Sequence, residues 1–539
     1  MCNPYYCKSM ETRHQPTDNC QVNLSPRKSI RFDIGCPKTI QSDETKEKCK
    51  LREYCPTLPT ASELKQYLAI VICGLSLWAT SWFIFGKVVL PGGYIFNMAA
   101  LVLTGYIFGH TLERYTKVNA VVGMVLVGTL SKIFLPINIL GNDSANILDY
   151  HLRRIYPVII LTKGPLTWNW DYIKHNSVKV FTLATLPWII ECLSTAFFTF
   201  IFLEFPWYWG LHLGAILASV SPAVVVPTLI SFDARGLGTK SNIALLVGNA
   251  GGLDTAFTEG MFGVINSAIF YESAPEYRVV KAFLAIFVGI VLGIVWGVLA
   301  DVLPDHDDVY AATIRSLHIF AGGLLISYAC GYFGWGGTSG VAIMVCAAAA
   351  ATRWARRGWP LNNNPVSEVY KLLWRIFEAM LFTLSGSFFE ISDLDAREFG
   401  LMVVCIFLAL ILRLLTAFLI ALSNELPVKE CIFIAITWIP KAIVEAVLVR
   451  VASDSLWKEG TTDHDRKIAT QHSNMIIIAI LLTTTIGSIL TTVMGPILLS
   501  PYSGVAPEEL VSRPRSPSTE STPSKRSQQL DSFQYIDMQ

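Results

Sequence analysis

Residues 243–270 read IALLVGNAGGLDTAFTEGMFGVINSAIF, an apolar stretch with one aspartate, Asp254, near its middle. About 20 largely apolar residues suffice to cross a bilayer as a helix, so we expect this stretch to span a membrane. A carboxylate at the centre of such a helix costs about 3 kcal/mol or more and normally faces the interior of the helix bundle. Gly251 and Gly252 precede it, and small residues let a second backbone approach closely. We therefore interpret Asp254 as a site that binds a proton and a cation.

The composition of the whole chain supports a membrane location. Of its 539 residues, 52% are hydrophobic and 15% are charged, whereas soluble proteins carry about 25% charged residues. We expect an all-α polytopic membrane protein. The net charge of +1 gives no reason to expect a nucleic-acid partner. The first apolar run starts near residue 67, too late for a signal peptide.

The chain divides into three parts by composition. Residues 1–66 are polar and are expected to form a disordered cytosolic tail, with six cysteines whose spacing fits no metal motif. Residues 67–500 are expected to form the transmembrane domain. Residues 501–539 are rich in Ser, Pro and Thr and are expected to form a second disordered cytosolic tail.

Apolar runs separated by short polar loops predict about fourteen transmembrane helices, of which the fourth is interrupted by Lys163 and Pro165. An even number puts both termini on one side, and the basic residues of the short loops indicate that this side is the cytoplasm. A glycosylation sequon at Asn142 falls in an expected outer loop and favours the plasma membrane. The expected spans are residues 67–86, 93–109, 120–136, 153–167, 177–204, 207–231, 241–270, 280–302, 311–332, 337–352, 368–390, 400–423, 429–451 and 473–500.

Two of these spans contain prolines that predict broken helices. Pro222 and Pro227 lie in the sixth span, and Pro440 lies in the thirteenth, directly before Lys441. Proline removes a backbone donor and clashes with the preceding turn. Two interrupted helices in corresponding positions of two halves are typical of inverted-repeat transporters, in which the half-helices cross near the midplane. The span before each break also carries a charged residue, Glu191 and Arg413 respectively.

Several motifs resemble the NHA branch of the sodium/proton exchangers. They are SVSPAVVVP at 219–227, the G-x-L-D segment that ends at Asp254, LRLLTAF at 412–418 and WIPKAIVEA at 438–446. The resemblance covers most of residues 67–500. It implies a fourteen-helix homodimer with an ion-translocation core that works by alternating access.

The resemblance also implies roles for individual residues. Asp254 matches the second aspartate of the ion-binding pair in that family. Glu191 and Arg413 match an acid and a base that pair within the core, and we expect them to hold the core together rather than carry ions. The matching residues of the two broken helices are Ser221, Pro222 and Lys441.

Three positions depart from the family pattern. Leu253 stands where the family has its first aspartate, Ile443 replaces a threonine, and Glu445 replaces a glutamine. One of the two carboxylates of the pair is therefore missing, which leaves the transported ion and the stoichiometry open.

A mechanism follows from the chemistry of Asp254. A carboxylate taken out of water holds a proton more readily, because desolvation disfavours its charged form, and it is also a ligand that Na⁺ prefers. Thr255 and Thr258 are candidate hydroxyl ligands, and Ser221 completes the candidate ion site. We expect one proton to be exchanged for one transiently bound Na⁺ or another alkali ion (Li⁺, K⁺), without net charge movement. The expected partners are these ions, membrane lipid and a second copy of the chain, with no cofactor.

Other interpretations remain open at this stage. Because Lys441 and Arg413 are kept while one acid is missing, the site is less negative than in the family and suits a proton-coupled chloride transporter. A transport-inactive regulatory homologue is a further alternative. An enzyme is the weakest, since the chain contains no H-E-x-x-H, G-x-S-x-G or Walker-type motif.

Overall fold

The computed structural model describes residues 61–134, 143–270, 275–305, 308–335, 337–359, 364–391, 394–456 and 462–501. Residues 1–60 and 502–539 of the two predicted tails, the N-terminal cysteines and Asn142 of the sequon lie outside these residues. Residues 61–66, expected to be disordered, belong to a helix. The chain divides into two compact units, Met1–Leu77 and Trp78–Gln539. The described part of the first unit is the helical segment 61–77, whose sequence is apolar from residue 67 onward.

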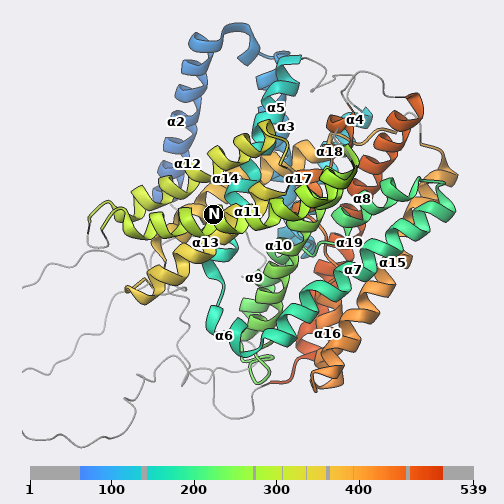
Figure 1. Ribbon diagram of the computed structural model, residues 1–539. Coiled ribbons are helices and arrows are strands. Elements are labelled where there is room, and N and C mark those ends of the chain that lie inside the picture. The colour runs from blue at the N-terminus through green and yellow to red at the C-terminus, as the bar shows by residue number, and fades with distance from the viewer. Residues whose placement is uncertain are drawn as a thin grey trace, which may run out of the picture. The chain divides into compact units, whose positions relative to one another are not determined.

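The second unit is helical throughout its described residues, apart from one isolated bridge between Leu237 and Pro501 (Figure 1). Two short 3₁₀ segments, Gly86–Val89 and Pro165–Thr167, accompany the α-helices. The α-helices are α2 (Ala61–Phe85, which begins in the first unit), α3 (Tyr94–Thr116), α4 (Ala120–Phe134), α5 (Asp143–Lys163), α6 (Trp170–His175), α7 (Ser177–Phe202), α8 (Trp207–Leu217), α9 (Pro222–Asp233), α10 (Ile243–Phe270), α11 (Pro275–Val302), α12 (Ala311–Tyr332), α13 (Thr338–Arg356), α14 (Pro365–Gly386), α15 (Ala396–Ser423), α16 (Val428–Thr437), α17 (Ile443–Leu448), α18 (Val451–Ser455) and α19 (Asp463–Leu498).

Helices long and apolar enough to cross a bilayer confirm the expectation of an all-α polytopic membrane protein. Nine stretches of the described residues qualify by length and composition, from Val71–Val89 to Asp463–Leu498. The other expected spans overlap helices, as 241–270 does with α10 and 429–451 does with α16 and α17, which a break separates. The number fourteen and the inverted repeat stay predictions.

The fourth expected span, 153–167, is displaced from the helix that the structure contains. α5 begins at Asp143 and ends at Lys163, because Gly164 and Pro165 do not continue the α-helix. Its first ten residues mix polar and apolar side chains and give no sustained hydropathy signal. Ion pairs hold this part: Arg153 contacts Asp149 at 2.8 Å and Asp454 at 2.5 Å.

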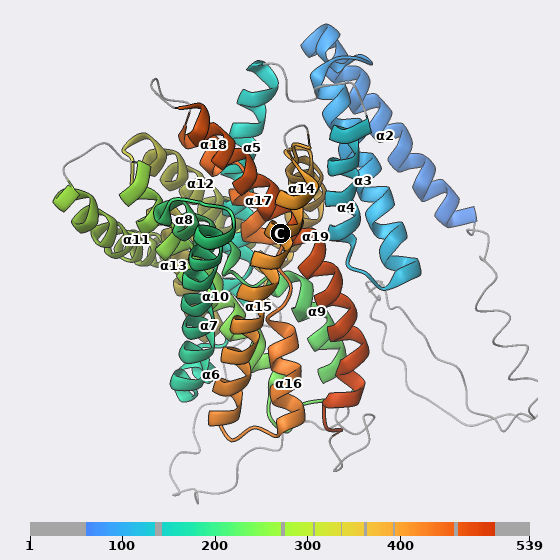
Figure 2. The same cartoon turned by 90° about the vertical axis from the view of Figure 1, so that its right-hand side faces the viewer.

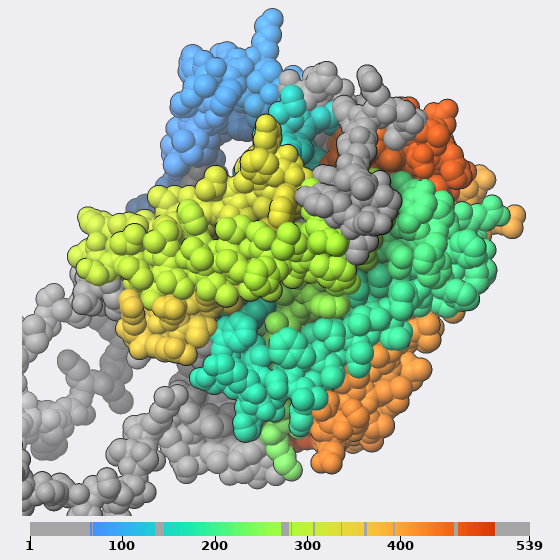
Figure 3. Space-filling view, in the orientation of Figure 1, coloured from blue at the N-terminus to red at the C-terminus, as the bar shows by residue number. Residues whose placement is uncertain are grey.

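One face of the second unit exposes apolar side chains along two bands of helix. Figure 3 shows α11 and α12 as one band and α7 as another. On α11, Phe283 and Phe287 are 59% and 63% exposed, and on α7, Phe197 and Phe200 are 49% and 54% exposed. Large exposed apolar surface of this kind marks membrane contact or protein association, in keeping with a membrane protein.

α19 passes the second broken helix at close range, and Gly487 makes this approach possible. A Cβ atom built at Gly487 would lie 2.5 Å from Cγ of Pro440 and 3.0 Å from its backbone nitrogen. Because the obstacle is a proline ring and backbone, even one added methyl group must displace one of the two segments.

Gly487→Ala is therefore expected to lower the free energy of unfolding by about 1–3 kcal/mol through overpacking, measured as a lower melting temperature of the purified protein. Gly400→Ala on α15 is the matched control, since nothing lies within 4 Å of its added Cβ and alanine is favoured over glycine in helices. Equal melting temperatures for Gly487→Ala and the wild type would contradict the close contact.

Candidate functional site

The two broken helices meet at their breaks. α8 ends at Leu217 and α9 begins at Pro222, while α16 ends at Thr437 and α17 begins at Ile443. Figure 2 shows α8 and α17 on one side of this region and α9 and α16 on the other. The backbone N–H of Ser221 donates a hydrogen bond to the carbonyl of Pro440 at 2.9 Å. Non-helical backbone at membrane depth needs partners within the protein, and each break supplies one to the other.

The prolines have different roles in the two breaks. Pro222 is the first residue of α9, where its missing N–H costs nothing and its fixed φ favours the helix. Pro440 lies inside the second break. The expectation that Pro227 also interrupts the helix is wrong, because α9 continues through it to Asp233. Pro227 is the sixth residue of α9, and its missing N–H removes one hydrogen bond of the helix. The N–H groups of the first turn before it have no partner within the helix in any case.

Four charged side chains from four segments form one buried network beside the breaks. Arg413 on α15 contacts Oε2 of Glu191 on α7 at 2.5 Å and Oδ2 of Asp254 on α10 at 3.1 Å. Lys441 of the second break contacts Oε1 of Glu191 at 2.8 Å. None of the four side chains is more than 2% exposed. Two carboxylates and two cations balance, so the network is neutral when all four are charged.

The two cations also cover the end of α8. Arg413 donates to the carbonyl of Ala218, and Nζ of Lys441 donates to the carbonyl of Leu217. The last carbonyls of a helix have no partner within the helix and carry partial negative charge. The network therefore connects the first break to Glu191 and Asp254.

Asp254 has both carboxylate oxygens occupied. Oδ1 accepts a hydrogen bond from the N–H of Val220 in the first break at 2.9 Å, and Oδ2 accepts from Arg413. A Cβ atom at Gly251 would lie 3.2 Å from Cγ of Pro222, so this face of α10 packs directly against the first break. A cation that binds Asp254 competes with Arg413 for the negative charge of this carboxylate.

The candidate hydroxyl ligands lie near Asp254 but donate elsewhere. Thr258 donates to the carbonyl of Asp254 at 2.8 Å, and Thr255 donates to the carbonyl of Gly251 at 3.1 Å. Both side chains are buried, as is Ser221, whose Oγ has no hydrogen-bond partner among the described residues. Each hydroxyl oxygen keeps acceptor capacity for a proton donor or a cation.

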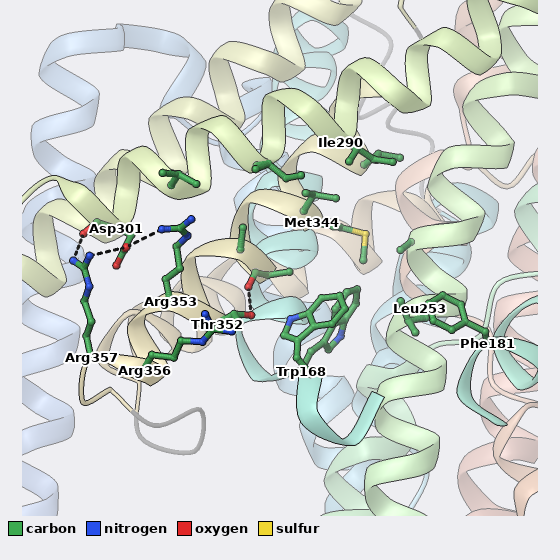
Figure 4. Close-up of a pocket in the computed structure, with 18 residues that line it drawn as sticks. Trp168, Phe181, Leu253, Ile290, Asp301, Met344, Thr352, Arg353, Arg356 and Arg357 are labelled. Carbon is green, nitrogen blue, oxygen red and sulfur yellow. Dashed lines mark hydrogen bonds and ion pairs between the residues drawn. The ribbon is translucent and has the colours of Figure 1, made fainter. Parts of the chain in front are cut away.

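Leu253 lies on another side of α10 and lines a cavity of about 750 Å³. Figure 4 shows Leu253 beside Phe181, with Trp168 at the same end of the cavity. At the far end, Arg357 and Arg353 contact Asp301 at 3.3 and 3.7 Å. The position at which the family has its first aspartate therefore faces the apolar end of this cavity rather than the charged network.

The residues that hold the second break in place were not predictable from sequence patterns. Thr483 of α19 accepts a hydrogen bond from the N–H of Lys441 at 3.2 Å, and Thr484 donates to its carbonyl at 2.5 Å. The only signal for them was a run of three threonines in an otherwise apolar span.

A buried histidine pair was also not foreseen. His212 contacts His472 at 3.0 Å and Oδ1 of Asn266 at 3.1 Å. Both histidines are fully buried. They lie on α8 and α19, 260 positions apart, so sequence spacing gave no indication that they meet.

Comparisons with known proteins agree with this architecture. The family profile described as "Sodium/hydrogen exchanger, transmembrane" matches residues 98–495. Sodium/hydrogen exchanger 9B2 of Homo sapiens is 29% identical over 434 residues, 78% of each chain, and that of Mus musculus is 28% identical over 511 residues, 92% of this chain and 89% of the relative. Sodium/hydrogen exchanger 9B1 of Mus musculus is 29% identical over 83% of this chain and 78% of its own.

A solved structure shares the fold. The sodium proton antiporter MjNhaP1 from Methanocaldococcus jannaschii at pH 8 superimposes with a TM-score of 0.61 at 20% identity, over 75% of this chain and 98% of that chain. At this identity the likeness concerns the fold alone.

Proposed function

The chain belongs to the sodium/hydrogen exchanger family, a family of membrane transporters rather than enzymes, and from this premise we propose that it exchanges protons for Na⁺, Li⁺ or K⁺ by alternating access. The observation that carries the proposal is the place of Asp254. Its carboxylate is fully buried and accepts a hydrogen bond from the backbone of the first break. Crossing breaks of this kind bind substrate and coupling ions in transporters of inverted-repeat architecture.

Asp254 serves as the cation ligand in this proposal. Na⁺ prefers carboxylate, carbonyl and hydroxyl oxygens, and Ser221, Thr255 and Thr258 bring hydroxyls to the same region. Arg413 must release Oδ2 of Asp254 before the ion binds, while Glu191 retains Arg413 and Lys441. Glu191 and Arg413 thus keep the core assembled during the exchange.

We also propose that the exchange is electroneutral, because one proton for one cation moves no net charge. We place the protein in the plasma membrane as a homodimer with both termini in the cytoplasm. The basic inner loops of the sequence support this orientation, and the apolar bands of α7 and α11 offer surface for lipid and for a second copy.

One observation favours a second candidate, proton-coupled transport of an anion such as chloride. In the structure Arg413 occupies Oδ2 of Asp254, so the carboxylate is already neutralised. If Arg413 moved away, it would leave a buried guanidinium that an anion can pair with. Cation and anion transport therefore differ in which partner of this one ion pair binds the substrate.

Ion replacement in vesicles that contain the purified protein separates the two candidates. An inward Na⁺ gradient is expected to drive protons out and make the lumen alkaline, equally well with chloride or gluconate as the counter-ion and with the voltage clamped. Proton movement that follows the chloride gradient without Na⁺ would favour the second candidate. A protein that moves protons with neither gradient would be a transport-inactive regulator.

A further inference from the structure

A fifth buried ionisable residue lies beside the network and forms no ion pair with its members. Glu445 is on α17, in the first turn after the second break, and is fully buried. Neither of its carboxylate oxygens has a hydrogen-bond partner on another residue among those described, and the backbone donor beside it is its own N–H.

The surroundings of Glu445 offer no fixed counter-ion. The charged groups that act on it are Lys441, Glu191 and Arg413, which are engaged with one another and with Asp254. α17 packs against α5, α8, α14 and α19. The buried titratable side chains of these helices are Asp149 and Tyr156 on α5, His212 on α8, Tyr370 on α14 and His472 on α19.

Those titratable groups have their own partners or are themselves uncharged phenols. Asp149 pairs with Arg153 at 2.8 Å, and the two histidines contact each other at 3.0 Å. On α14, Ser385 donates to the carbonyl of Ala446 rather than to the neighbouring carboxyl group. A buried carboxylate without a partner is so costly that the group takes up a proton instead, so Glu445 is neutral in this structure.

Asp254 is in the opposite condition. Its Oδ2 pairs with Arg413 at 3.1 Å, an ion pair that requires the carboxylate form, and its Oδ1 accepts a hydrogen bond from the N–H of Val220. The proton that leaves when a cation binds therefore cannot come from Asp254 in this state. Among the five ionisable residues at the breaks, Glu445 is the carboxylic acid that holds a proton.

We propose that Glu445 is the proton-binding carboxyl group of the exchange and Asp254 the cation ligand, an assignment that rests on the proposed function. A cation at Asp254 adds one positive charge to a neutral network. Loss of the proton from the Glu445 carboxyl group to water, on the side to which the site is open, adds one negative charge. The buried site is neutral before and after, and rebinding a proton on the other side expels the cation.

Two transport modes measured on one variant test this assignment. Glu445→Gln removes the exchangeable proton and keeps the shape of the side chain. In vesicles, we expect Na⁺-driven proton flux to fall to the level of protein-free vesicles. Exchange of radioactive Na⁺ for unlabelled Na⁺ without a pH gradient should persist. It should need a higher Na⁺ concentration for half-maximal rate, because loss of a proton from residue 445 no longer compensates the charge of the bound ion. Proton flux at the wild-type level in Glu445→Gln would overturn the proposal.

A second variant decides the case in which Glu445→Gln carries neither flux. Glu445→Asp keeps a titratable group in a changed position, so it should carry proton flux with an altered pH dependence. An unchanged pH dependence, or tracer exchange without proton flux, would overturn the proposal. Failure of the proposed function looks different, because the wild type itself would then show neither Na⁺-driven proton flux nor Na⁺ tracer exchange.

Discussion

Asp254→Asn is expected to abolish both Na⁺-driven proton flux and Na⁺ tracer exchange in vesicles, down to the level of protein-free vesicles. The substitution removes the negative charge that binds the cation, while the amide oxygen can still accept the hydrogen bond from Val220. Arg413 keeps its contacts with Glu191 and the carbonyl of Ala218. The fold should therefore survive, and loss of flux would report on the ion site rather than on misfolding.

Glu259→Gln is the matched control on the same helix. Glu259 lies five positions after Asp254 and faces α13, where a Cβ atom at Gly340 would lie 2.6 Å from its Oε2. The described structure gives it no contact with either break, so Glu259→Gln should keep both transport modes. Flux at the wild-type rate in Asp254→Asn would rule out that carboxylate as the cation ligand.

The sequence predicted the helices where apolar runs are long and the breaks where proline can begin or interrupt a helix. Pro222 and Pro440 mark the two breaks because one starts a helix and the other lies in non-helical backbone. Pro227 gave a false signal, since a helix accommodates a proline near its start. The beginning of α5 was missed because ion pairs of Asp149 and Arg153, rather than hydropathy, hold that part.

The candidate site was only partly predictable. The resemblance implied the pair of Glu191 and Arg413, and the structure contains it. The contact between Arg413 and Asp254 depends on how α10 and α15 each pack against α7, which no spacing along the chain encodes. For the same reason, the sequence did not indicate that Lys441 would reach Glu191, or that Glu445 would be left without a partner.

Arg413→Gln is expected to destabilise the protein by about 3–5 kcal/mol, the cost of removing one partner of a buried ion pair. The guanidinium contacts two carboxylates and the end of α8, and glutamine replaces none of these charges. Melting of the purified protein measures the loss. Arg353→Gln is the control, because Arg353 is 46% exposed and lies 3.7 Å from Asp301, which keeps Arg357 at 3.3 Å. Asp301 itself is buried, but Arg357 still pairs with it after this change, so we expect a loss of about 0–1 kcal/mol, as for exposed pairs.

The double variant Arg413→Gln with Asp254→Asn shows where the cost arises. If Arg413→Gln destabilises by leaving Asp254 charged without a cation, removing that charge must restore part of the stability, and the two effects will not add. If the cost comes from lost packing of the arginine stem, the double variant will be no more stable than Arg413→Gln alone. Recovery would therefore establish that Arg413 neutralises Asp254 in the folded protein, which is the condition under which a cation must compete with Arg413 for this carboxylate.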